Sequence, residues 1–196
     1  MKKVRLKMIA KKDAAKAYLY LLSAIYSGNL DQRKKIGTLL KDLPDRLKQC
    51  IDFENMRLKT EARKLIKIVA TGGKFELLHP GHLFVFEQAK KLGDVLVVVA
   101  ATDKLIEKAK KRKPLLNQKE RLSMLNALKV IDIAIPGCAD KSITLAKVDP
   151  DVIVLGYDQV LTFPEALLKG KEIIRLKKAK NYSSSFLFKR KKTNAF

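Results

Sequence analysis

Residues 71–82 have the sequence TGGKFELLHPGH and join a short apolar segment, residues 65–70, to a helix-compatible segment, residues 82–92. The two glycines of this turn allow the backbone to approach a ligand closely. Pro80 and Gly81 suit the start of a helix. Because a helix N-terminus presents free N–H groups and a positive dipole end, the turn predicts a site for a phosphate.

Both histidines of the chain, His79 and His82, lie in this turn. Two imidazoles at a helix entrance can direct N–H groups toward one point and stabilise charge on phosphorus during a displacement. The alternative, a pair of half-buried structural histidines, does not explain why both crowd into one glycine-rich turn. No third His, paired Cys or nearby carboxylate cluster completes a zinc shell, so Mg²⁺ brought in with a triphosphate fits better.

Short apolar segments and helix-compatible segments alternate from residue 65 onward. The segments expected as strands are residues 65–70, 94–101, 131–136, 152–156 and 172–176. The segments expected as helices are residues 82–92, 104–111, 118–128, 142–148 and 163–169, and Asn117 with Glu120 suits a capping box for the third. This alternation predicts an α/β fold with a Rossmann-like, doubly wound parallel sheet of five strands, whose ligands bind beyond the carboxyl ends of the strands.

The first 64 residues have a different pattern. Apolar residues repeat at helical spacing between residues 14 and 25 and the repeat ends at Ser27-Gly28-Asn29, which predicts a helix. A second stripe between residues 36 and 51 is interrupted at Pro44, and a third helical stretch is expected from residue 53 to about 66. The sequence therefore predicts a basic helical bundle over residues 1–64 and a separate α/β domain over residues 65–196.

The formal charge of +22 is distributed unevenly. Residues 1–66 hold 17 basic and 7 acidic side chains, residues 67–174 hold 17 and 13, and residues 175–196 hold 8 and none. Basic ends attract polyanions such as nucleic acid, so a nucleic-acid-binding module with a nucleotide-binding fold is an alternative of another class. A lysine-rich surface without a partner accounts for the same charge equally well.

Cysteine content and hydropathy bear on the location of the protein. Cys50 and Cys138 are 88 positions apart and belong to no C-x-x-C pair, so a disulfide framework is not indicated. The longest apolar run, residues 95–101, is far below the roughly 20 residues of a membrane span. We expect a cytoplasmic protein with no membrane span.

The turn at residues 71–82 resembles the signature G-x-F-D-x-x-H-x-G-H of the cytidylyltransferase-like nucleotidyltransferases. The matching positions are Gly73, Phe75, His79, Gly81 and His82. Lys74 stands where the family often has Thr or a small residue, and Glu76 where it usually has Asp. Later segments follow in the family's order over about residues 66–192: Arg112-Lys113-Pro114, then RLSML at residues 121–125, and a hydroxyl-rich turn with a following basic residue at residues 183–190.

The resemblance implies that an acceptor phosphate attacks the α-phosphorus of a nucleoside triphosphate and expels magnesium pyrophosphate. It places His79 and His82 beside the α-phosphate and makes Lys113 and Arg121 cationic clamps on phosphates or acceptor. Asp103 would line the acceptor pocket. The residues expected to bind the nucleotide are Gly73, Lys74, Phe75, Pro80, Gly81, Asp158, Ser183, Ser184, Ser185 and Arg190.

Within the family, the chain is most similar to archaeal FAD synthases, which adenylylate FMN. The similarity runs from Lys113-Pro114 through the G-x-D-Q pattern at residues 156–159 to the terminal Ser pair. A cytidylyltransferase acting on glycerol phosphate or another polyol or sugar phosphate is the alternative, and Lys74 and Glu76 also leave open a sensor that binds nucleotide without chemistry. The family implies a homodimer. The N-terminal segment would serve dimerisation, substrate covering or anchoring to a polyanion.

Overall fold

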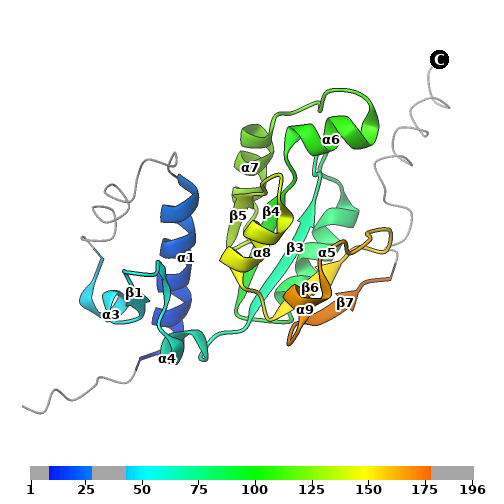
Figure 1. The fold of residues 1–196 in the computed structure, drawn as a ribbon. Coiled ribbons are helices and arrows are strands. Elements are labelled where there is room, and N and C mark those ends of the chain that lie inside the picture. The colour runs from blue at the N-terminus through cyan, green and yellow to red at the C-terminus, as the bar shows by residue number, and fades with distance from the viewer. Residues whose placement is uncertain (1–8, 28–42, 178–196) are drawn as a thin grey trace, which may run out of the picture. The chain divides into compact units, whose positions relative to one another are not determined.

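The computed structural model describes residues 9–27 and 43–177, and the chain divides into two compact units, Met1–Ile66 and Lys67–Phe196. No helix among the described residues combines the length and the apolar character that crossing a membrane requires. Figure 1 shows the helices and strands of both units.

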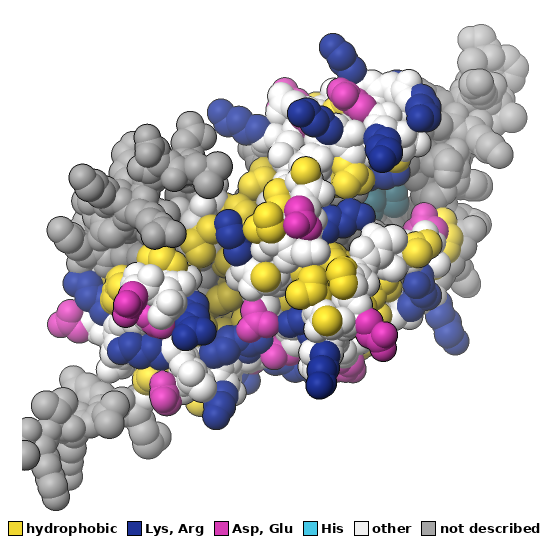
Figure 2. Space-filling view, in the orientation of Figure 1, with side chains coloured by type: hydrophobic (Ala, Val, Ile, Leu, Met, Phe, Trp, Pro, Cys, Tyr) yellow, Lys and Arg dark blue, Asp and Glu magenta, His cyan; other side chains and the backbone are white. Residues whose placement is uncertain are grey.

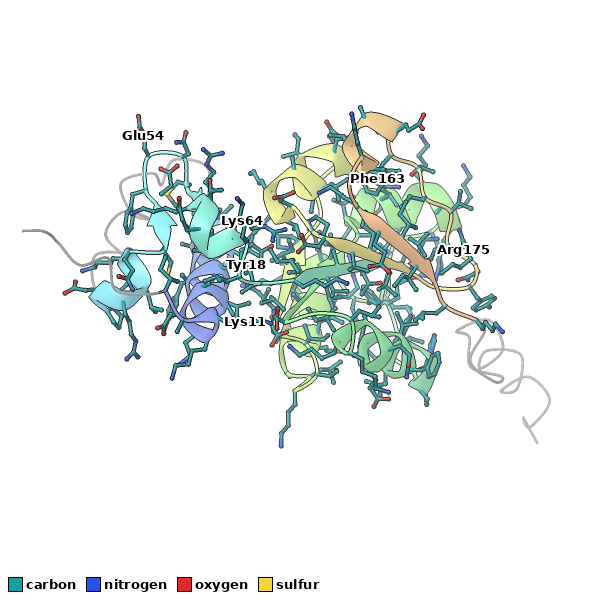
Figure 3. The ribbon with its side chains drawn as sticks, turned by 90° about the horizontal axis from the view of Figure 1, so that it is seen from below. Lys11, Tyr18, Glu54, Lys64, Phe163 and Arg175 are labelled. Atoms are coloured by element: carbon teal, nitrogen blue, oxygen red, sulfur yellow. The ribbon has the colours of Figure 1, made fainter. Side chains whose placement is uncertain are left out.

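The first unit is built on α1 (Lys11–Ser27), which confirms the helix expected there. Its apolar stripe is buried at Ala14, Ala17, Tyr18, Leu21, Leu22 and Ala24. The helix packs against α3 (Asp45–Lys48), β2 (Arg57–Leu58) and α4 (Thr60–Arg63). Strand β2 pairs antiparallel with β1 (Ile51–Asp52), and Figure 3 shows Tyr18 on α1 and Glu54 in the turn between the two strands.

The prediction of a third helix in this unit, from residue 53 to about 66, is wrong. The chain forms the β1–β2 hairpin there, and only the short α4 is helical. The Asp52 carboxylate accepts hydrogen bonds from the backbone N–H of Asn55 at 3.2 Å and from its side-chain amide at 2.9 Å, and Met56 has a φ of 52°. Such local side-chain bonds compete with helix formation. Much of the second predicted stripe, residues 28–42, lies outside the described residues.

The second unit contains a five-stranded, wholly parallel sheet, which confirms the predicted fold. Its strands are β3 (Ile68–Gly73), β4 (Val95–Ala100), β5 (Ile133–Pro136), β6 (Val152–Leu155) and β7 (Glu172–Arg175). Their order across the sheet is β5-β4-β3-β6-β7 (Figure 1). The chain leaves β3 in one direction and later returns to its other side at β6. This reversal opens a crevice at the carboxyl ends of β3 and β6.

Helices cover both faces of the sheet. They are α5 (Pro80–Lys90), α6 (Asp103–Lys110), α7 (Gln118–Asn126), α8 (Lys141–Val148) and the single-turn α9 (Glu165–Leu168). Phe86 of α5 and Leu125 of α7 belong to one apolar cluster with Leu96 and Val98 of β4. On α8, Leu145 joins a second cluster with residues of β6 and of the segment around α9. The capping box predicted at Asn117 and Glu120 is confirmed.

Candidate active site

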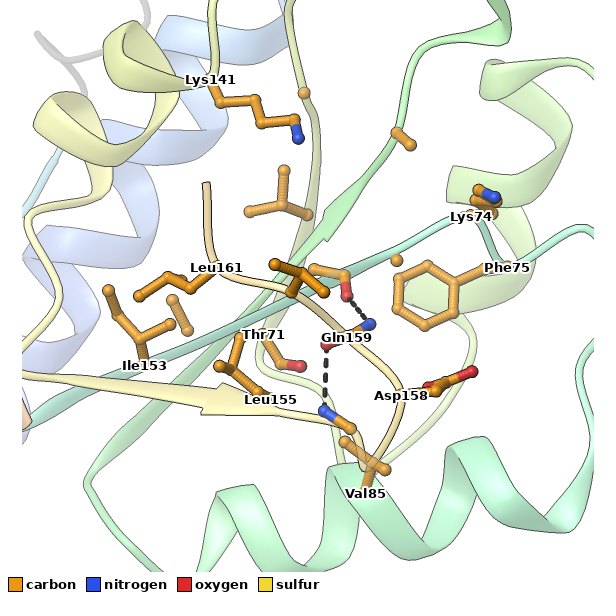
Figure 4. Close-up of a pocket in the computed structure, with 18 of the residues that line it drawn as sticks. Thr71, Lys74, Phe75, Val85, Lys141, Ile153, Leu155, Asp158, Gln159 and Leu161 are labelled. Atoms are coloured by element: carbon orange, nitrogen blue, oxygen red, sulfur yellow. Dashed lines mark hydrogen bonds between the residues drawn. The ribbon is translucent and has the colours of Figure 1, made fainter. Parts of the chain in front are cut away.

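The carboxyl ends of β3, β4 and β6 border a cavity of about 690 Å³. The structure brings to its wall most of the nucleotide-binding and catalytic residues expected from residues 71–82 and 158: Gly73, Lys74, Phe75, His79, Gly81, His82 and Asp158. Figure 4 shows Lys74, Phe75 and Asp158 on the same side of this cavity, and Figure 2 shows histidine surface in a recess of the molecule. Pro80 is the first residue of α5 and is not part of the wall.

The two histidines form one stacked pair at the start of α5. Their ring centroids are 3.8 Å apart with 21° between the ring planes. The Phe75 ring meets the edge of His82 at a centroid distance of 5.2 Å and 72°, so His82 is held between two rings. The Nδ1 atoms of both histidines are buried without a hydrogen-bond partner among the described residues. Buried polar atoms normally have partners, so two unpaired nitrogens in one turn set the histidine pair apart from ordinary structural histidines.

Burial keeps the histidine pair neutral near pH 7. Burial, and to a smaller extent the neighbouring His79, lower the pKa of His82 to about 4. Burial also lowers the pKa of His79, an effect that the Asp158 carboxylate opposes in part. A neutral imidazole carries one N–H donor and one acceptor nitrogen. The pair therefore acts on a substrate through oriented hydrogen bonds and not through two positive charges.

Lowering the pH from 6.5 toward 4 should destabilise the protein through His82. Unfolded His82 takes up a proton in this range and folded His82 does not, so the stability present above pH 6.5 is lost on acidification. At about 1.4 kcal/mol per pKa unit, this side chain accounts for a loss on the order of 3 kcal/mol. Urea unfolding at several pH values measures the loss. The variant His82→Gln should show a smaller loss over the same range, and an equal loss would contradict the assignment.

Phe75 explains why Gly73 must be a glycine. Phe75 has a φ of 48° and turns its buried ring back over Gly73, where an added Cβ would lie 2.6 Å from the ring. The ring cannot retreat, because it also packs on His82 and on Phe86, at a centroid distance of 5.4 Å from the latter.

Gly73→Ala should therefore lower the free energy of unfolding by about 1–3 kcal/mol, as overpacking does in other cores. Gly72→Ala is the matched control, because a Cβ there would meet its nearest atom at an ordinary 3.6 Å. Chemical denaturation of both variants checks the difference. Equal free energies of unfolding for Gly73→Ala and Gly72→Ala would show that the Phe75 ring can move to accommodate the added Cβ.

Glu76 anchors the segment that follows α6 and does not face the substrate as a free carboxylate. The buried carboxylate accepts hydrogen bonds from Lys110, from Arg112 at 2.9 Å and from the backbone N–H of Leu115 at 3.3 Å. Burial alone would raise the pKa of Glu76, but the bonds from Lys110, Arg112 and Leu115 outweigh it and lower the pKa. Glu76, which stands where the family usually has Asp, therefore holds the segment after α6 in place. Its position in the sequence did not reveal this structural function.

Arg121 has a different place from the one expected, and its assignment as a phosphate clamp is corrected. The side chain is fully buried and lies outside the cavity wall. Its guanidinium donates to the backbone oxygens of Leu116 at 3.1 Å, Lys74 at 2.6 Å and Ala101 at 2.7 Å, and to Asp103 Oδ1 at 2.6 Å. Arg121 thus ties three loops together and has no free surface for a substrate.

Two more expected residues lie away from the cavity wall. Asp103 accepts from Arg121 and, through Oδ2, from the backbone N–H of Gln118 at 3.2 Å, so its carboxylate serves internal contacts and not an acceptor. Lys113 is exposed in the segment after α6. Figure 2 shows basic side chains over this part of the molecule. Ser183, Ser184, Ser185 and Arg190 lie outside the described residues.

Gln159 ends the G-x-D-Q pattern at residues 156–159 but was not among the residues expected to bind the nucleotide. Its side-chain amide donates to the Gly72 oxygen at 2.7 Å and accepts from the Gly156 N–H at 3.0 Å, as the dashed lines in Figure 4 show. It therefore joins the ends of β3 and β6 beside Asp158. Arg175 of β7, labelled in Figure 3, donates a hydrogen bond to the backbone oxygen of Gln159 and so holds the same loop. Among the described residues, no group of three or more His, Cys, Asp or Glu is gathered in a way that could hold a metal ion.

Comparison with known proteins agrees with this geometry. The family model described as cytidylyltransferase-like matches residues 70–195. An FAD synthase of Methanohalophilus mahii is 46% identical over 108 residues, which are 55% of this chain and 72% of that protein. An FAD synthase of Thermococcus sibiricus is 42% identical over 123 residues, which are 58% of this chain and 82% of that protein. The crystal structure of the lipopolysaccharide core biosynthesis protein from Thermoplasma volcanium GSS1 has a TM-score of 0.52 at 37% identity, over 59% of this chain and 99% of that one.

Proposed function

Because the chain belongs to the cytidylyltransferase-like family, we propose that it is an FMN adenylyltransferase, which transfers AMP from ATP to FMN and releases pyrophosphate. The observation that carries the proposal is the pair of neutral, stacked histidines at the N-terminus of α5, beside Gly73 and Lys74 in one cavity. The relatives called FAD synthase supply the identity of the two substrates.

In the proposed step, a phosphate oxygen of FMN forms a bond to the α-phosphorus of ATP. The bond from that phosphorus to the bridging oxygen breaks, and pyrophosphate leaves with the electron pair. His79 and His82 donate hydrogen bonds to the oxygens on which charge develops, and the N-terminus of α5 adds its free N–H groups. Lys74 offers a positive charge at the same wall. No side chain forms a covalent bond to the nucleotide, so positioning and charge stabilisation supply the rate.

Mg²⁺ fits this site as a companion of the triphosphate. The wall contains the carboxylates of Asp158 and Glu76, and Glu76 is paired with Lys110 and Arg112. This suits an ion bound chiefly by phosphate oxygens and water. The ion would neutralise charge on the leaving pyrophosphate. By the family resemblance, Ser183 to Ser185 and Arg190 would hold the same group. A cytoplasmic location belongs to the proposal because ATP and FMN are available there.

Pyrophosphate release by the purified protein with Mg²⁺ tests the proposal. ATP and CTP are each tested as donors with FMN, glycerol 3-phosphate and a panel of sugar phosphates as acceptors. Release should require ATP together with FMN, and FAD should appear in equal amount. Release from CTP with a polyol or sugar phosphate would instead make the chain a cytidylyltransferase. Salt-sensitive binding of RNA without any turnover would favour the nucleic-acid module suggested by the basic ends.

A further inference from the structure

The cavity extends well beyond the histidine turn, onto the face of the sheet beneath α8. This half of the wall is apolar and is formed by Leu145, Val148, Ile153, Leu155, Leu161 and Phe163. Figure 4 shows Ile153, Leu155 and Leu161 on the opposite side from Lys74 and Phe75. Leu145, Ile153 and Leu155 also pack together in the cluster that includes Leu161 and Phe163. The surface that this cluster contributes to the cavity is not used by the histidine turn or its phosphate chemistry, so it is open to the second part of the substrate pair.

A few polar groups border the apolar half. Lys141, the first residue of α8, donates through Nζ to Thr162 Oγ1 at 3.2 Å, and both residues line the cavity. Thr144 is buried one turn later, where its hydroxyl accepts from the Cys138 N–H at 3.3 Å. The half is thus suited to a ligand with one hydrocarbon edge and one edge that accepts hydrogen bonds.

We propose that this apolar half binds the isoalloxazine ring of FMN, with Lys141 at the carbonyl-bearing edge of the ring, an inference that rests on the proposed function. The dimethylbenzene edge of the ring is hydrocarbon and gains from burial against leucine and phenylalanine. Adenine carries polar nitrogens around its edge, which would lose hydrogen bonds among aliphatic side chains. ATP therefore binds on the side of the cavity near Asp158.

The cavity also allows one FMN molecule to place its ring in the apolar half and its phosphate at the histidine turn. FMN joins its ring to its phosphate through a ribityl chain, so both ends must lie in one continuous space. The apolar half and the histidine turn belong to the same cavity, and Thr71 and Gln159 lie between them (Figure 4). A ring bound beneath α8 can thus present its phosphate to His79 and His82.

Two measurements on Lys141→Met test the inference. Riboflavin, which has the ring but no phosphate, is titrated by its fluorescence, and steady-state kinetics give KM for FMN and for ATP. The variant should weaken riboflavin binding and raise KM for FMN by roughly tenfold or more, the loss expected for a hydrogen bond from a charged group. KM for ATP should stay unchanged. Leu161→Asn should have the same selective effect by making the apolar wall polar.

Lys147→Met is the matched control, because Lys147 is exposed on the same helix and is not part of the cavity wall. A raised KM for ATP with an unchanged KM for FMN would overturn the inference and place adenine in the apolar half. Normal FMN kinetics in Lys141→Met and Leu161→Asn would also overturn it, although FAD synthesis by the wild type would leave the proposed function intact. A wild-type protein that neither binds riboflavin nor makes FAD would defeat both.

Discussion

His79→Ala and His82→Ala should each lower kcat for FAD formation by about 10²–10³-fold, the range found when one preorganised donor to a developing oxyanion is removed. Each substitution deletes one N–H group from the stacked pair and leaves the other ring without its neighbour, from which its centroid is 3.8 Å away. The donors act most strongly on the transition state, so KM for ATP should change much less than kcat. Steady-state release of pyrophosphate measures both constants.

Leu83→Ala is the control for the histidine variants, because Leu83 follows His82 on α5, is 39% exposed and lies outside the cavity wall. It should retain turnover. Circular dichroism and thermal melting check that the histidine variants fold, since their rings also pack beside Phe75. Wild-type kcat in both histidine variants would remove the pair from the mechanism.

Arg121→Met should lower the free energy of unfolding by about 3–5 kcal/mol, because it removes the donor from three backbone oxygens and each buried acceptor left unpaired costs about 1–3 kcal/mol. The substitution leaves Asp103 without its cation and removes the donors to three backbone oxygens. Denaturation in urea measures the change. Lys113→Met is the matched control, because Lys113 is exposed and should contribute little.

The same substitution separates a structural function of Arg121 from a direct phosphate contact. Should Arg121→Met fail to fold, Asp103→Asn provides a milder disruption of the same pair. In either variant, the folded protein should bind ATP with a KM close to that of the wild type. Unchanged stability together with a strongly raised KM for ATP would restore Arg121 as a phosphate clamp.

The sheet could be predicted because its strands are continuous apolar runs separated by helical segments. The first strand is displaced, from the expected residues 65–70 to Ile68–Gly73, because Thr71, Gly72 and Gly73 pair with Val98, Val99 and Ala100 of β4. Glycine has little intrinsic tendency to form strands, so its pairing here depends on the neighbouring strand. The hairpin in the first unit was missed for a different, local reason, since hydrogen bonds from Asn55 to the Asp52 side chain replace the expected helix.

The candidate site was predictable where its residues follow one another along the chain. His79, Gly81 and His82 reach the cavity together because one turn and the start of one helix carry them. The contacts of Glu76 and Arg121 depend on partners 34 and 47 positions away, so residue type alone could not separate a buried structural cation from one that meets a phosphate. The resemblance in family signature and order is confirmed by the match over residues 70–195.

Transfer of label from ATP to FMN shows whether the histidine turn catalyses attack on the α-phosphorus. Purified protein is incubated with Mg²⁺, FMN and ATP labelled either at the α-phosphate or at the γ-phosphate. We expect the α-label to appear in FAD and the γ-label in pyrophosphate, and we expect His82→Ala to form both products far more slowly. An α-label that stays in ATP, or that leaves as AMP without FAD, would show that the turn does not transfer AMP to FMN.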